Sequence, residues 1–486
     1  MANTDVIILN NVVDNSANFN ALIESEGLDF NIHPLDGDVM SYIRDFQMID
    51  DTTEFSIFKK ADKIKELWKL LIKKSIICLR FYDTREPFLD TRAKSPHAYG
   101  VEELADYFDK YTEFESLLYG GSRYYRDHIV HVFRVWLLGV KVFLENDCDY
   151  LKRVKVDDDC TVNCLEKLSM WTIMALTHDL GYPLQKALQI IEKTQSMMKS
   201  FVVNPIVSMN LSFTGVQNSM NDFILRFIGS KMHKQDNGET FVARLQPKYY
   251  FKFQKSLEHN AHGILSAVII YKMLTFFLES DYNINEDYEF NQEDVRQYYI
   301  RREILRAIAS HTCHDIYQLN IFSFSFFLIL CDDAQEWGRK SLSDLYVEKG
   351  DVYKFEGIQN IFNDENNNTC TLMDKYEVEK TSSIDYILKR FEEQSKTYRD
   401  VFRDGQETNN RNFNFVRQVE IDVTKLSPSK NYILKLFIKR DEQTKIVAKR
   451  TNDDVLSDKE EFYKALKDVF GNIQLSDDRI QVVITL

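Results

Sequence analysis

The sequence predicts a mainly α-helical protein that ends in a small domain of mixed α and β structure. Apolar residues recur at helical spacing almost continuously from position 101 to about 340, and beyond it they alternate as in strands. Of the 486 residues, 44% are hydrophobic and 13% aromatic, enough for packed cores and too many for a disordered chain. We therefore predict an N-terminal, largely helical extension (1–100), a helical domain (101–345) and a C-terminal α+β domain (346–486).

The helices of the first two regions follow from their apolar spacing. In the extension, one long helix is expected over 54–82, where five residues recur near helical spacing: Phe58, Ile64, Leu67, Leu71 and Ile76. The helical domain contains an expected insertion around 201–256. Its predicted helices are 101–118, 121–146, 163–180, 183–199, 216–232, 246–280, 291–311 and 320–340.

In the C-terminal region, strands and helices are predicted in the order β-α-β-β-(β)-α-β. This order suggests a small ferredoxin-like domain. The strands are expected at 369–379, 413–423, 432–439, 445–449 and 480–486, and the helices at 382–402 and 458–470.

Charge, cysteine content and hydropathy narrow the class of protein. The 61 basic and 75 acidic residues leave a net charge of −14, which argues against general binding of duplex nucleic acid. The seven scattered cysteines indicate free thiols and a cytoplasmic location. The sequence shows neither a secretory signal nor an apolar stretch long enough for a membrane span. Homo-oligomerisation stays open.

Histidines carry the strongest functional signal. Seven of the ten lie in four groups within the predicted helical domain. Imidazole and carboxylate groups brought together from several helices form a mixed nitrogen and oxygen site for a divalent transition metal. Gly181 and Pro183 should end a helix just after one of these groups and expose its side chains there. The four groups are His128 with His131, His178 with Asp179, His259 with His262, and His311 with His314.

These residues resemble the HD-domain superfamily of metal-dependent phosphohydrolases. Its pattern is H…HD…D on an all-α core, often with two further His before the last Asp, and the likeness covers roughly residues 120–340. The resemblance implies one or two divalent metals, with Mn, Fe, Mg, Zn and Ni all open. The ligands it implies are His131, His178, Asp179, His259, His311 and Asp332.

For several of these ligands, a nearby residue remains an alternative. His262 and His314 could replace His259 and His311, and Asp333 lies next to Asp332. Asp127 or His128 could carry protons, and Asp179 belongs to the catalytic set.

The resemblance does not identify a substrate. The chain has Tyr182 where related cyclic-di-GMP phosphodiesterases have Lys and dNTP triphosphohydrolases usually have His. It has Asp127 where mammalian-type cyclic nucleotide phosphodiesterases have His.

A basic segment precedes the later histidines. Seven basic and two acidic residues lie within 226–255. If one helix covers 248–262, three lysines share a face with His259 and His262, and this face would suit a polyanionic phosphate substrate. The alternative is a solvated lysine face. The expected phosphate-binding residues are Lys248, Lys252, Lys255 and, seven positions after Asp332, Arg339.

The leading hypothesis is a phosphohydrolase that attacks a nucleotide or another phosphate ester with a metal-activated water. The partner would then be an anionic, phosphate-containing small molecule or nucleotide. One alternative is a diiron oxygenase, because some HD-fold proteins use the same ligands for O₂ chemistry. Another is a sensor or scaffold that binds metal or nucleotide without turnover.

Overall fold

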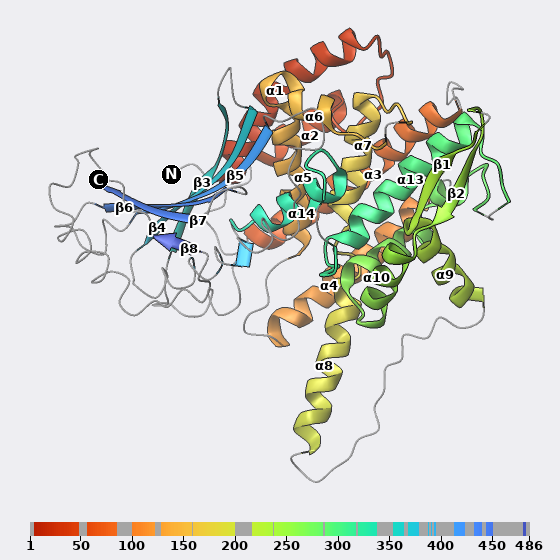
Figure 1. Cartoon of the computed structure of the whole chain (residues 1–486). Coiled ribbons are helices and arrows are strands. Elements are labelled where there is room, and N and C mark those ends of the chain that lie inside the picture. Colours follow the sequence, from red (N-terminus) through yellow and green to blue (C-terminus); the bar gives the residue numbers. More distant parts are fainter. Residues whose placement is uncertain are drawn as a thin grey trace.

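A computed structural model provides the coordinates, and elements are named by the labels of Figure 1. The described residues are 4–47, 56–84, 100–121, 128–157, 159–199, 216–236, 238–284, 287–316, 319–337, 353–363, 368–378, 387, 390, 393–394, 413–422, 432–439, 444–450 and 480–482.

The described chain is mainly α-helical, as the sequence predicts, and the helices form one body beside a curved sheet (Figure 1). The elements of the body are α1 (Thr4–Ser25), α2 (Gly37–Gln47), α3 (Ser56–Thr84), α4 (Val101–Gly121), α5 (Ile129–Leu144), η3 (Asn146–Cys148), α6 (Asp149–Arg153), α7 (Cys164–Thr177), α8 (Tyr182–Lys199), α9 (Val216–Ile228), β1 (Ser230–Lys234), β2 (Phe241–Leu245), α10 (Pro247–Glu258), α11 (His262–Met273), α12 (Thr275–Leu278), α13 (Gln292–Ser310) and α14 (Phe324–Ala334).

Helices α5 and α7 form the centre of the body. Every residue of α5 is buried, and in α7 only Lys167 is not. Both helices are surrounded because α1, α3, α13 and α14 pack around them. A capping box starts α7, in which the Asn163 side chain accepts from the Glu166 N–H and the Glu166 carboxylate accepts from the Asn163 N–H.

Indole groups fix how the central helices contact each other. The Nε1–H of Trp68 in α3 donates to the carbonyl of Leu176 (2.8 Å), in the last turn of α7. Trp171 of α7 donates to the carbonyl of Trp136 in α5 (3.1 Å). At Gly139, α5 approaches Trp171 so closely that a Cβ would lie 2.6 Å from its Nε1. These contacts hold the C-terminal end of α7 in place.

Two predicted helices are interrupted. The expected helix 216–232 ends at Ile228, and a hairpin of β1 and β2 follows, because Gly229 packs on the α10 backbone with a Cβ position only 3.1 Å from Tyr250 Cα. The expected helix 246–280 is divided into α10, α11 and α12. Asn260 breaks it with a φ of +51°, in the left-handed region that helices exclude.

In the described part of the chain, the C-terminal sheet is mixed and has six strands in sequential order, so the prediction of a ferredoxin-like domain is wrong. A ferredoxin-like sheet is antiparallel with an interleaved strand order. Here β4 and β5, and likewise β7 and β8, are direct parallel neighbours, and the other pairs are antiparallel. The strands are β3 (Tyr353–Asn363), which the sequence did not predict, β4 (Asn368–Val378), β5 (Phe413–Asp422), β6 (Tyr432–Lys439), β7 (Thr444–Arg450) and β8 (Ile480–Val482).

A short segment after β4 joins this region to the helical body. Arg390 pairs with Glu336 (2.8 Å), and the Gln394 amide donates to the carbonyl of Asp333 (2.7 Å). Most of the expected helix 382–402 and all of 458–470 lie outside the described residues. Among the described helices, none is both long and apolar enough to cross a membrane.

We predict that Gly139→Ala lowers the free energy of unfolding by about 1–3 kcal/mol, because the new methyl group overlaps the buried indole of Trp171. Chemical denaturation of both proteins measures the difference. Gly37→Ala is the matched control, since its Cβ would meet no atom within 4 Å, and it should change stability by about 1 kcal/mol or less. Equal effects of the two substitutions would contradict the packing argument.

Candidate metal centre

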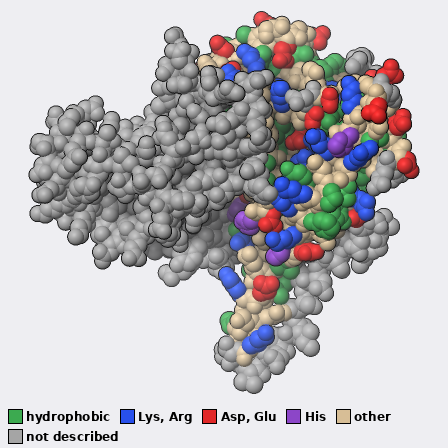
Figure 2. Space-filling model, in the orientation of Figure 1, with side chains coloured by type: hydrophobic (Ala, Val, Ile, Leu, Met, Phe, Trp, Pro, Cys, Tyr) green, Lys and Arg blue, Asp and Glu red, His purple; other side chains and the backbone are tan. Residues whose placement is uncertain are grey.

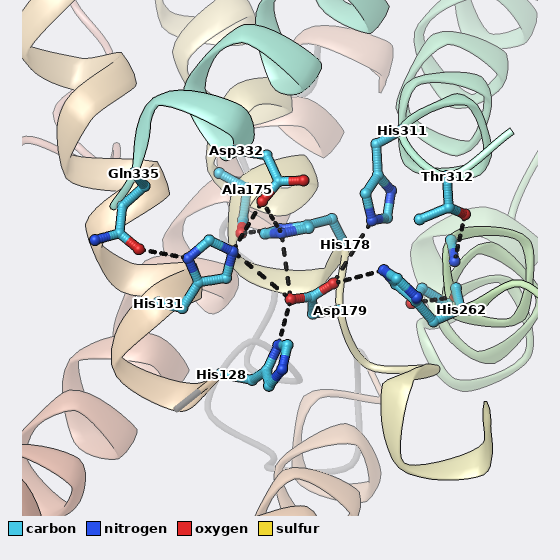
Figure 3. A network of polar contacts seen from close by, with 12 residues as sticks. His128, His131, Ala175, His178, Asp179, His262, His311, Thr312, Asp332 and Gln335 are labelled. Carbon is cyan, nitrogen blue, oxygen red and sulfur yellow. Dashed lines mark hydrogen bonds and ion pairs between the residues drawn. The ribbon is translucent and has the colours of Figure 1, made fainter. Parts of the chain in front are cut away.

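Ends of five helices bring histidines and aspartates together in the middle of the body (Figure 3). His131 lies in the first turn of α5, and Asp332 lies near the end of α14. His178 and His311 directly follow the last residues of α7 and α13. His262 is the first residue of α11. The residues are far apart in sequence, so only the packing of these helix ends assembles the cluster.

Two glycines allow the helix ends to approach this closely. A Cβ on Gly181 would lie 2.6 Å from the Leu265 Cβ, and the Gly181 N–H donates to Ser266 Oγ in α11 (2.8 Å). A Cβ on Gly263 would lie 2.9 Å from Cε1 of His311. Larger residues at these positions would separate α11 from the ends of α7 and α13.

Each ligand-type imidazole is oriented by an oxygen at its Nδ1. His178 bonds the carbonyl of Ala175 (2.9 Å) and His311 that of Ile308 (2.6 Å). A carbonyl oxygen only accepts, so Nδ1 of each ring carries a proton and Nε2 faces the cluster. Side-chain amide oxygens do the same for two more histidines: Gln335 for His131 (2.6 Å) and Gln185 for His262 (2.7 Å). This arrangement is typical of histidines that bind metals through Nε2.

The Asp179 carboxylate lies between two sets of imidazoles (Figure 3). Its Oδ2 is 3.7 Å from Nε2 of His131 and 3.6 Å from Nε2 of His178. Its Oδ1 is 3.2 Å from Nε2 of His262 and 3.5 Å from Nε2 of His311. One carboxylate with each oxygen facing a different pair of nitrogen donors has the geometry of a bridge between two ion positions.

Asp332 completes the first of these positions. Its Oδ1 is 2.9 Å from Nε2 of His131 and 3.8 Å from Nε2 of His178. Ligand atoms about 2.1 Å from a shared ion lie about 3.0–3.4 Å apart in octahedral or tetrahedral geometry. The separations in the cluster, 2.9–3.8 Å, bracket this range. The donor set therefore fits a divalent transition metal.

Two buried nitrogen atoms support the same conclusion. Nε2 of His178 and Nε2 of His311 are buried and have no hydrogen-bond partner among the described residues. Such an atom costs free energy unless a partner is bound. Both point toward the carboxylate of Asp179, and each belongs to a group of donor atoms close enough to share an ion.

The cluster keeps its carboxylates ionised. Burial raises the pKa of Asp179, but His178, with three further histidines, outweighs this and holds the pKa well below its usual value. Burial likewise opposes ionisation of Asp332, and His131 and His178 hold its pKa low. Burial lowers the pKa of His178, but the two carboxylates raise it to about 9. Burial lowers the pKa of His311, which favours its neutral, metal-binding form.

The structure places His262 rather than His259 in the cluster, and it places Asp332 there rather than Asp333. His259 is exposed at the end of α10, with its Nδ1 on the carbonyl of Lys255, so the prediction of His259 as a ligand is wrong. His262, its competitor, faces Asp179 because the break at Asn260 turns the chain between them. Asp332 lies in the cluster, whereas neighbouring Asp333 lies 4.0 Å from Arg390. His314 is exposed.

The three expected phosphate-binding lysines do not share a helix face with His259 and His262, because α10 ends at Glu258, before both histidines. The Lys252 ammonium donates to the carbonyl of Asp315, and that of Lys255 pairs with the Asp315 carboxylate (2.8 Å). Lys248 is exposed. Figure 2 shows acidic and basic side chains interspersed over the described part of this face. Asp127 and Arg339 lie outside the described residues.

One face of α4 contacts the cluster and was missed in the sequence. Tyr107, Tyr111 and Glu115 are spaced four residues apart and so share a face. Tyr107 donates to the carbonyl of Leu180 (2.7 Å), and Glu115 accepts from the N–H of His128 (2.7 Å). Between them, the buried Tyr111 hydroxyl has no hydrogen-bond partner in the described part of the chain. The four-residue spacing of these side chains is the sequence feature that could have indicated this face.

His128, which the sequence singled out, and Gln335 and Trp337, which it did not, support the ligands from outside. His128 Nδ1 bonds Oδ2 of Asp179 (2.8 Å), while its ring stacks on Tyr182 with centroids 3.7 Å apart. Gln335, which orients His131, also donates to the carbonyl of Trp337 (2.7 Å). The Trp337 indole in turn donates to Asp5 in α1 (2.8 Å).

Asp5 also pairs with Arg134, one turn after His131, through two bonds of 2.7–2.8 Å. The first helix of the chain is therefore connected to the first ligand helix.

Comparisons with protein-family models, with curated proteins and with solved structures found no match for this chain.

We predict that protein purified without chelator carries about two divalent ions per chain, held by the two donor sets that share Asp179. His311→Ala should remove about one of them, because it deletes a ligand of the second ion position only. Elemental analysis of the purified proteins measures the content. His259→Ala is the matched control and should keep the wild-type content. Metal-free wild-type protein, or a loss in the control equal to that in His311→Ala, would contradict the assignment.

Proposed function

We propose that this chain is an HD-type, metal-dependent phosphohydrolase that acts on a nucleotide or another phosphate ester. The observation that carries the proposal is the Asp179 carboxylate, whose two oxygens face separate sets of imidazole Nε2 atoms. Paired ion positions that share one ligand suit the hydrolysis of phosphate esters. Six of the seven cysteines are free and buried, as expected in a reducing compartment, and the proposal places the reaction in the cytoplasm.

The bound ions would activate a water for in-line attack and neutralise charge on the phosphoryl oxygens. The chain's own residues would prepare the site for this chemistry. His131, His178, Asp179 and Asp332 would hold the first ion, and Asp179, His262 and His311 the second. His128 would orient the shared carboxylate through its Nδ1.

Substrate would approach from the side of Asp332 and His262. Their side chains are 26% and 20% exposed, whereas those of the other cluster residues are almost fully buried. The second donor set supplies only three protein atoms. This leaves room there for water and phosphoryl oxygens, as catalytic metal sites require.

Tyr111 is the best-placed proton donor for the leaving group. Burial raises the pKa of its hydroxyl well above the usual value, and the charges of Glu115 and Asp179 raise it further, so the hydroxyl stays protonated. A protonated hydroxyl on the face of α4 that contacts Leu180 and His128 can donate to an oxygen that develops negative charge. We assign Tyr111 this role in place of Asp127, and we assign His128 the orientation of Asp179.

Replacing Asp179 by Asn should reduce phosphate release to the background rate, because an amide cannot supply two anionic oxygens to two ions. The measurement is phosphate release from a panel of nucleotides with Mn²⁺ or Mg²⁺ present. Asp333→Asn changes a neighbour of the ligand Asp332 in the same way and should keep wild-type activity.

Other results of these measurements would contradict the mechanism or favour one of the alternative functions. Full activity of Asp179→Asn would overturn the mechanism. Bound iron with O₂ consumption and no phosphate release would identify a diiron oxygenase. Nucleotide binding without turnover would identify a sensor or scaffold.

Tyr111→Phe should slow hydrolysis of an unactivated nucleotide ester about 10²-fold, and slow bis(p-nitrophenyl) phosphate by roughly threefold or less. The reason is that p-nitrophenolate leaves without protonation, whereas a sugar alkoxide does not. The kcat values on the two esters measure this difference. Tyr288→Phe, which loses a hydroxyl that bonds Asp294 away from the cluster, is the control. Equal losses on both esters would exclude a proton-donor role for Tyr111.

A further inference from the structure

A pocket of about 320 Å³ lies between α1 and α2, and none of its lining residues belongs to the metal cluster. Small-molecule sites begin at about this volume. The residues that line it are Ser16, Phe19, Asn20, Asn31, His33, Leu35, Asp36, Gly37, Met40 and Arg44.

His33 supplies an unpaired donor in the wall of this pocket. The residue is only 6% exposed. Its Nδ1 accepts from the N–H of Leu35 (3.2 Å), so the ring proton lies on Nε2. No residue in the described ranges accepts this Nε2–H. Burial, with a smaller contribution from Lys74, lowers the pKa of His33 to about 4 despite the opposing charge of Asp36, so at neutral pH the ring is an uncharged donor.

The one acidic group of the pocket is already occupied. Asp36 Oδ1 accepts from the N–H of Val39 (3.2 Å), and Oδ2 accepts from the Lys74 ammonium and from the N–H of His33. Lys74 partly offsets the charge of this carboxylate, because its ammonium also pairs with Asp38 (2.9 Å). Asp36 therefore offers no unused oxygen to a cationic ligand.

The remaining polar groups are mainly donors. Arg44 lines the pocket and has no ion pair or hydrogen bond to any described residue, although the protein as a whole carries a charge of −14. The amides of Asn20 and Asn31 also line the pocket, and Phe19, with Leu35 and Met40, supplies apolar surface. A guanidinium with nearby N–H donors is suited to a carboxylate or phosphate group.

We propose that this pocket binds a small organic anion. Its carboxylate or phosphate pairs with Arg44 and accepts the Nε2–H of His33, and its carbon skeleton contacts Phe19 and Met40. The site is separate from the metal cluster, and the inference does not depend on the proposed hydrolase activity.

Isothermal titration calorimetry of the full-length protein as purified tests this site, with inorganic phosphate, AMP and citrate as probes. At least one probe should bind once per chain, and Arg44→Gln should weaken that binding tenfold or more. Binding of phosphate and AMP alone identifies a phosphate site, and binding of citrate alone a carboxylate site. Arg44 is exposed, so its replacement should leave the fold intact.

Two controls locate the bound anion. Arg226→Gln changes an exposed arginine that pairs with Asp222 elsewhere, and it should leave the affinity unchanged. His311→Ala disrupts the metal cluster and should also leave it unchanged. The proposal is overturned if no probe binds, if Arg44→Gln binds like the wild type, or if binding disappears in His311→Ala.

Discussion

The structure of the central body depends on one buried carboxylate. Asp179 contacts five imidazoles at 2.8–3.7 Å and is itself almost completely buried. A charged group in such a position is tolerated only when its neighbours compensate it. The ends of α5, α7, α11 and α13 must therefore meet at this carboxylate, and their packing is constrained to bring them there.

The ligands sit at helix ends for a chemical reason. The last carbonyls of a helix lack intrahelical donors, and the carbonyls of Ala175 and Ile308 take the Nδ1 protons of His178 and His311. The helix end gains a donor, while the imidazole gains a fixed orientation and an available Nε2. Gly181 and Gly263 then let these ends approach α11 without a side chain between them.

Sequence reasoning predicted the parts of the cluster that a local residue pattern determines. It failed where the three-dimensional path of the chain determines which residues meet. The His178–Asp179 doublet and its following glycine predicted a helix end with exposed ligands. The structure ends α7 at Thr177 as expected, but the two side chains are buried. His259 was preferred over His262 on the family resemblance, and the assumption of a continuous helix placed both histidines on one face. A single left-handed residue, Asn260, invalidated that assumption, and helical phase cannot reveal such a break. The strand order of the C-terminal sheet was also mispredicted, because strand spacing specifies strands and not their neighbours.

The connection from Asp5 through Trp337 and Gln335 to His131 sets an order for folding. Asp5 and Trp337 are separated by 332 positions, whereas Arg134, another partner of Asp5, lies 129 positions away. During synthesis, α1 can therefore meet α5 early, but its contact with Trp337 must wait until nearly 340 residues have been made. We expect the metal cluster to be completed late in folding, since contacts this distant in sequence form slowly.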